Sequence, residues 1–68
     1  MTEIVEELYN AYGNKVAQGM CAHAAWALVV NFGYLRGKEE GLDTSSVRML
    51  IHQVQQRIKT SWEKQDGI

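Results

Sequence analysis

The 68-residue sequence contains no proline, one cysteine and two histidines. A single cysteine excludes a disulfide scaffold, and one cysteine with two histidines is too few for an ordinary structural zinc site. The lack of proline removes the residue that most strongly interrupts helices, and no segment alternates apolar and polar residues as a half-buried strand does. We therefore predict an all-α domain that holds no metal and no cofactor.

The chain has a net charge close to zero and lacks common catalytic motifs. Seven Lys and Arg residues against eight Asp and Glu residues give a formal net charge of −1, which excludes a strongly basic, phosphate-binding molecule. With 46% hydrophobic residues, the composition is not that of a disordered chain. The sequence has no glycine-rich phosphate loop, no nucleophile elbow and no constellation of paired carboxylates. We expect a folded protein that has no catalytic residues and is not an enzyme.

Long hydrophobic runs are also missing. The longest, from Ala24 to Val30, is far shorter than the roughly 20 residues that span a bilayer. The first ten residues carry three glutamates and no lysine or arginine, unlike the basic start of an export signal. We expect a cytoplasmic protein that does not enter a membrane.

Apolar residues recur at helical spacing along most of the chain, which predicts one domain of three helices over 1–68. The expected bounds are about 3–12, 15–36 and 44–64. Gly13 and Asn14 predict the first break, because glycine suits the residue after a helix and asparagine can cap the next one. The helix could also continue through this pair with a kink.

The segment 37–43 is polar and is predicted to be a loop, after which Asp43 or Thr44 can cap the third helix. Gly33, Gly37 and Gly41 are spaced four apart. That spacing permits a close crossing of two helices, but the charged residues among these glycines favour the end of a helix followed by a turn, which is what we predict.

The second predicted helix is apolar nearly all round, which is typical of a central helix. We expect one broad face of it to form the core: Cys21, Ala22, Ala25, Trp26, Leu28, Val29, Phe32 and Leu35. A three-helix monomer would leave the opposite, mixed face exposed, and the short chain has no disulfide or metal to stabilise it. We therefore predict a homo-oligomer, with a dimer as the expected form. Its interface would include Met20, Ala24, Ala27, Tyr34 and Trp62.

The two tryptophans and the cysteine receive separate predictions. Trp26, in the most apolar stretch, is expected to anchor the core. Trp62 is the better candidate for a contact across an interface, where tryptophan is enriched, although it could also cover the end of its own core. Cys21 is expected to be a buried, unreactive thiol.

Charge is divided between the two ends of the chain. Residues 1–14 hold three acidic side chains and no basic one, whereas residues 44–64 have a net charge of +3. The first and third helices should therefore attract each other, within one chain or between chains.

The segment 41–52, GLDTSSVRMLIH, resembles the turn and recognition helix of helix-turn-helix proteins, notably of sigma-factor-like domains. The resemblance rests on the turn glycine, the apolar residue after it, the small polar run, and then Val47 and Leu50. It implies a helix that reads the major groove of DNA. The side chains on its groove face would be Arg48, His52, Gln55, Gln56 and Lys59. The preceding helix departs from the motif, with Arg36 and Glu40 at positions that should be apolar.

These patterns lead to two functional hypotheses. The first is a small non-catalytic module that binds another protein as a regulator, adaptor or inhibitor and forms a helical homodimer. The alternative is a dimeric helix-turn-helix-like DNA-binding regulator, which the acidic balance of the whole molecule disfavours. We therefore expect protein partners and no nucleic acid.

Overall fold

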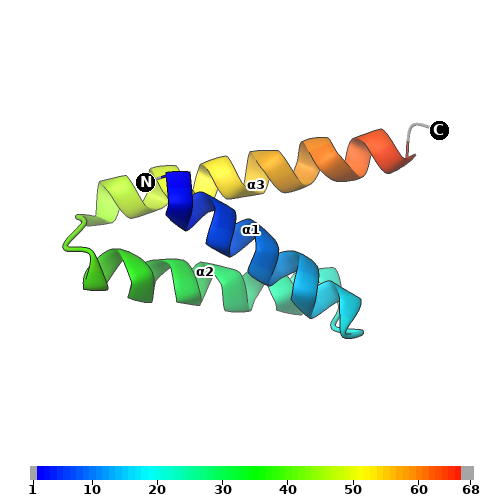
Figure 1. Ribbon diagram of the computed structural model, residues 1–68, viewed down its shortest axis with the longest axis horizontal. Coiled ribbons are helices and arrows are strands. Elements are labelled where there is room, and N and C mark those ends of the chain that lie inside the picture. The colour runs from blue at the N-terminus through cyan, green and yellow to red at the C-terminus, as the bar shows by residue number, and fades with distance from the viewer. Residues whose placement is uncertain (1, 67–68) are drawn as a thin grey trace.

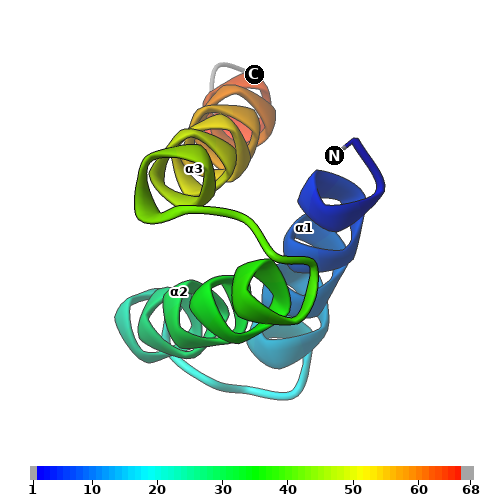
Figure 2. The same cartoon turned by 90° about the vertical axis from the view of Figure 1, so that its left-hand side faces the viewer.

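The computed structural model describes residues 2–66, and it describes side chains from residue 3 to residue 61. It contains three helices: α1 (Thr2–Ala17), α2 (Ala22–Glu39) and α3 (Thr44–Asp66). Helices α2 and α3 lie side by side and run in opposite directions, while α1 crosses obliquely over both (Figure 1). Viewed end on, the three helices surround one shared centre (Figure 2). The predicted all-α, three-helix fold is confirmed.

The first helix is longer than predicted, because it continues through Gly13 and Asn14 and ends at Ala17. Its buried row explains the extension: Tyr12 is buried and Val16 packs against the same core one turn later. Packing of this row therefore outweighs the local preference of glycine and asparagine for a break. The second helix consequently starts at residue 22 and not at residue 15.

The actual break lies at Gly19, which has φ +98°, in the left-handed region that favours glycine. The N–H of Gly19 donates to the carbonyl of Val16 at 3.0 Å, and the N–H of Met20 donates to the carbonyl of Lys15 at 3.1 Å. This pair of bonds is a Schellman motif, which satisfies carbonyls at the end of a helix. The apolar residue that follows the glycine, Met20, packs against the core.

The second turn repeats this arrangement. Gly41 has φ +74°, its N–H donates to Lys38, and the N–H of Leu42 donates to the carbonyl of Gly37 at 2.8 Å. The Asp43 side chain then caps α3 by accepting a hydrogen bond from the N–H of Ser46 at 2.9 Å. The predicted cap at Asp43 is confirmed. The polar loop is shorter than predicted, because α2 extends to Glu39.

Three helices contribute to one core. Its buried members are Ile4, Val5, Leu8, Tyr12, Ala25, Val29, Leu50 and Val54. The largest fully buried side chains, Leu8, Val29 and Val54, come one from each helix. No helix among the described residues combines the length and apolar character needed to cross a bilayer.

Small residues on α2 allow α3 to approach closely. Gly33 and Gly37 are buried within α2 and do not end it. A Cβ atom at Gly33 would lie 3.3 Å from side-chain atoms of both Ile51 and Leu8, and one at Gly37 would overlap the Cγ2 of Val47. The predicted helix end and turn at these two glycines is therefore wrong, and the close helix crossing is what their spacing provides. Gly41 does form the predicted turn.

Polar contacts join α1 to α3 within the chain, which is one of the two arrangements that the opposite charges of these helices allowed. The Arg57 guanidinium donates two hydrogen bonds to the carboxylate of Glu6 and lies 4.4 Å from the centre of the Tyr9 ring. The Tyr9 hydroxyl donates to Ser61 at 3.1 Å. Hydrogen bonding from Arg57 lowers the pKa of Glu6 below its ordinary value, and the Glu6 carboxylate in turn raises the pKa of Arg57.

Candidate functional site

Three large apolar side chains of α2 point away from the core. Leu28, Phe32 and Leu35 are 44%, 46% and 63% exposed. Their spacing of four and then three residues places them in one row along the helix. Large apolar side chains gathered in a row on a surface are typical of a binding site, whereas single exposed ones are ordinary. We call these three residues the α2 stripe.

The α2 stripe lines an open groove between α1 and α2. The groove has a volume of about 270 Å³ and is lined mainly by apolar atoms. Its floor and walls are Ala11, Lys15, Leu28, Val29, Asn31, Phe32 and Leu35. Ala11 has only a methyl group, so α1 does not fill the space that faces the longer side chains of α2. The hollow follows from this difference in side-chain size.

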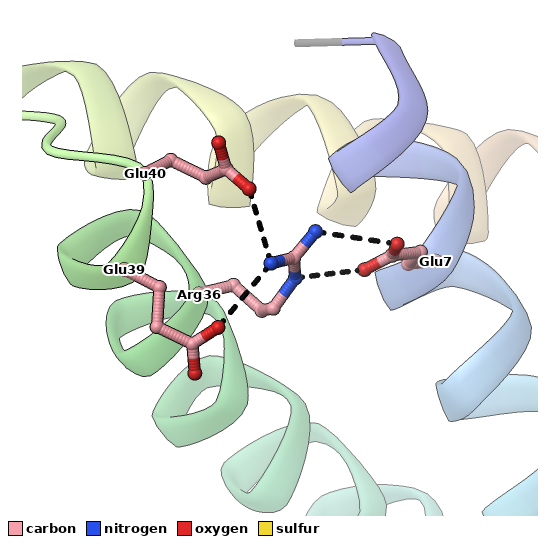
Figure 3. A network of polar contacts seen from close by, with 4 residues as sticks. All are labelled: Glu7, Arg36, Glu39 and Glu40. Atoms are coloured by element: carbon pink, nitrogen blue, oxygen red, sulfur yellow. Dashed lines mark hydrogen bonds and ion pairs between the residues drawn. The ribbon is translucent and has the colours of Figure 1, made fainter.

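One end of the groove carries a network of charges. Arg36 lies among Glu7 from α1 and Glu39 and Glu40 from the end of α2 (Figure 3). Its Nε and Nη2 donate to the two oxygens of Glu7 at 2.9 and 3.3 Å, and its Nη1 donates to Glu40 at 3.1 Å and more distantly to Glu39 at 3.4 Å. These carboxylates, Glu7 first, raise the pKa of Arg36. Lys38 lies in the same last turn of α2, so two cations and three anions leave this end with one excess negative charge.

The other end of the groove carries a positive charge. Lys15 lies two turns after Glu7 on the same face of α1, with Ala11 between them. It forms no ion pair with any residue from 3 to 61. The apolar groove therefore has a cation at one end and surplus carboxylates at the other.

The exposed stripe corrects a prediction, because Leu28, Phe32 and Leu35 were all expected in the core. Helices α1 and α3 both approach α2 along the narrower row of Ala25, Val29, Gly33 and Gly37, which are buried. Two neighbouring helices cover only that row, so the flank of the apolar face stays open. Helical spacing gave the width of this face correctly but could not say which part of it the neighbours would cover.

Three further residues of the predicted core face differ from prediction, and the first is Ala22, which is exposed in the first turn of α2. Cys21 is exposed, because it is the residue before α2 and not part of a buried face. Trp26 was expected to anchor the core, but it is half-buried at the margin and packs edge-on against Tyr12, with ring centres 6.4 Å apart. Its size and apolar surroundings in the sequence indicated the core, yet its position on α2 places it at the edge of the core, where it lines a hollow with Tyr12 and Ile58.

The residues predicted for the oligomer interface do not form one surface. Met20 is half-buried and packs against the core, while Ala24 is exposed one turn before Leu28, in line with the α2 stripe. Ala27 and Tyr34 are exposed on the opposite flank of α2. Tyr34 lines a separate hollow toward α3. The side chain of Trp62 lies outside the described residues.

The predicted nucleic-acid face lies together on α3. All five of its side chains are exposed: Arg48, His52, Gln55, Gln56 and Lys59. Gln55 and Lys59 also border a hollow beside Trp26. In the part of the chain that the structure describes, no group of three His, Cys, Asp or Glu side chains could hold a metal ion.

Comparison with known proteins finds no matching family model, no matching curated protein and no matching solved structure. The candidate site therefore rests on the geometry of the chain itself.

Proposed function

We propose that this protein is a small non-catalytic protein–protein interaction module that acts as a regulator, adaptor or inhibitor and forms a helical homodimer. The observation that carries the proposal is the α2 stripe, in which Leu28, Phe32 and Leu35 are exposed together. The core closes without them, since α1 and α3 approach α2 along the neighbouring row of Ala25, Val29, Gly33 and Gly37. Apolar side chains that a fold does not use for itself favour association.

The proposal has a direct test in the molecular mass of the purified chain. Sedimentation equilibrium from 1 to 500 µM should give a mass that rises with concentration from 7.7 kDa toward twice that value. Such a dimer should form by burial of apolar surface, so it should persist in high salt. A mass that stays at the monomer value over the whole range would contradict the homodimer.

The alternative is a DNA-binding regulator, favoured by the exposed row of Arg48, His52 and Lys59 on α3. Two features disfavour it. Helices α2 and α3 lie side by side (Figure 1), whereas the two helices of a helix-turn-helix cross steeply. The molecule also has a net charge of −1.

Duplex binding distinguishes the two functions. A groove-reading α3 would give sequence-selective affinity that falls steeply with salt and is lost in Arg48→Ala/Lys59→Ala. We expect only weak non-specific binding, with a Kd of about 10⁻⁴ to 10⁻⁶ M that does not depend on the DNA sequence. Nanomolar, sequence-selective binding would establish the alternative.

A further inference from the structure

The groove between α1 and α2 has the pattern of a surface that fits a second copy of itself. In an interface around a two-fold axis, the same patch serves both chains, so residue i of one chain contacts residue j of the partner, and residue j contacts residue i of the partner. Leu28 and Leu35 are equally distant in sequence from a centre between Asn31 and Phe32. An α2 helix laid antiparallel on this centre would bring Leu28 against the partner's Leu35 at both ends.

The charges at the ends of the groove obey the same symmetry. The end near Leu28 carries Lys15, and the end near Leu35 carries the surplus carboxylates of Glu39 and Glu40 around Arg36. An antiparallel copy places the positive end of each chain against the negative end of the other. A parallel copy would instead bring like charges together at both ends, which is unfavourable.

We propose that two copies of this chain associate through the α2 stripe, with their α2 helices antiparallel and Lys15 of each chain facing the acidic residues Glu39 and Glu40 of the other. This inference rests on the homodimer of the proposed function and adds its surface and orientation. In the same register the small Ala24 falls opposite the partner's Glu39, which leaves room there for the long side chain of Lys15.

Neighbouring alanine substitutions on α2 test the surface. Leu35→Ala should weaken dimerisation by about tenfold or more, because the change removes apolar contact from both copies. Tyr34→Ala, on the opposite flank, is the matched control and should leave the dimer dissociation constant unchanged. Circular dichroism checks that both variants stay helical. If Tyr34→Ala weakens the dimer and Leu35→Ala does not, the homodimer remains but this inference is overturned.

A charge exchange tests the orientation. Lys15→Glu and the double variant Glu39→Lys/Glu40→Lys should each dimerise more weakly than the wild type, because each places like charges across the interface. Mixed together, they should form a heterodimer that restores wild-type affinity, since both contacts become attractive again. Native mass spectrometry of the mixture, with one variant isotopically labelled, measures this preference. Statistical mixing of the two variants would overturn the antiparallel arrangement.

Cross-linking supplies an independent measurement on the same dimer. In a Cys21→Ser background, Asn31→Cys lies beside the proposed axis and should be joined efficiently to its counterpart by a short bismaleimide. His23→Cys, two turns away along the same helix, should not. Efficient cross-linking at residue 23 alone would overturn the inference, and a chain that sediments as a monomer would overturn both this inference and the homodimer.

Discussion

Because Gly37 has no side chain, α3 can pack closely against α2 at this position. A Cβ atom there would overlap the Cγ2 of Val47, whereas a Cβ atom at Gly13 would meet nothing within 4 Å. Both glycines lie inside helices, where alanine is intrinsically preferred by about 1 kcal/mol. Alanine at Gly13 therefore reports helix propensity alone, whereas alanine at Gly37 also reports the packing of α2 against α3.

Alanine at these two glycines should have opposite effects on the free energy of unfolding. Gly13→Ala should stabilise the protein by about 0.5–1 kcal/mol, since only helix propensity changes. Gly37→Ala should destabilise it by about 1–2 kcal/mol, since overpacking outweighs the propensity gain. Urea denaturation followed by circular dichroism gives both values. A Gly37→Ala variant as stable as Gly13→Ala would show that α3 can move away without cost.

At the scale of elements, two neighbouring glutamates connect α1 to different helices. Glu6 binds Arg57 of α3, and Glu7 binds Arg36 of α2. The oblique crossing of α1 over both helices makes this division possible (Figure 1). Exposed ion pairs contribute little stability singly, so these pairs chiefly fix the angle at which α1 lies.

The bond between Glu6 and Arg57 should make stability depend on pH. Because the folded state lowers the pKa of Glu6 below 4.5, its contribution is present above that pH and is lost as the pH falls through the folded value. The hydrogen bonds of Ser46, its side chain first and its backbone N–H next, lower the pKa of Asp43 in the same direction. The wild type should therefore lose stability as the pH falls below about 4.5.

Replacement of Glu6 tests its share of this acid sensitivity. Between pH 7 and pH 3, the urea midpoint of Glu6→Gln should fall less than that of the wild type. Glu3→Gln removes the same charge from α1 without removing the Arg57 bond. Its urea midpoint should therefore fall by more than that of Glu6→Gln between pH 7 and pH 3. Equal pH profiles for Glu6→Gln and the wild type would mean that the ion pair does not contribute.

At the scale of the whole molecule, the described residues form one core to which every helix contributes. Leu8 of α1 is 1% exposed and lies close to Gly33 of α2 and, beside it, Ile51 of α3. No two helices enclose this centre without the third. We therefore expect the helices to fold and unfold together in a single transition.

Truncation of Leu8 should affect the entire fold. Leu8→Ala should cost about 2–5 kcal/mol, a large part of the roughly 3–10 kcal/mol expected for a chain of this length. Met49→Ala, at an exposed position on α3 outside the groove, should change the free energy of unfolding by less than about 0.5 kcal/mol. Thermal unfolding of both variants, monitored by far-ultraviolet circular dichroism, makes the comparison. A loss of α1 alone, with α2 and α3 still helical, would contradict one cooperative core.

The sequence alone determined the helical class, the third helix and its cap at Asp43 or Thr44, because these depend on local spacing and on hydrogen bonds between near neighbours. The charge separation between the ends of the chain likewise predicted the contact of α1 with α3. These features need no knowledge of what lies beside each helix.

Only the tertiary structure decided which part of α2 faces the core and where the first helix ends. Gly13 and Gly19 are both acceptable helix breaks locally, and burial of Tyr12 and Val16 selected Gly19. Gly33 and Gly37 looked like the end of a helix, yet they are the surface on which α3 packs. That close packing orients α2 so that Leu28, Phe32 and Leu35 remain exposed. A residue's burial depends on its neighbours in space, which helical periodicity does not specify.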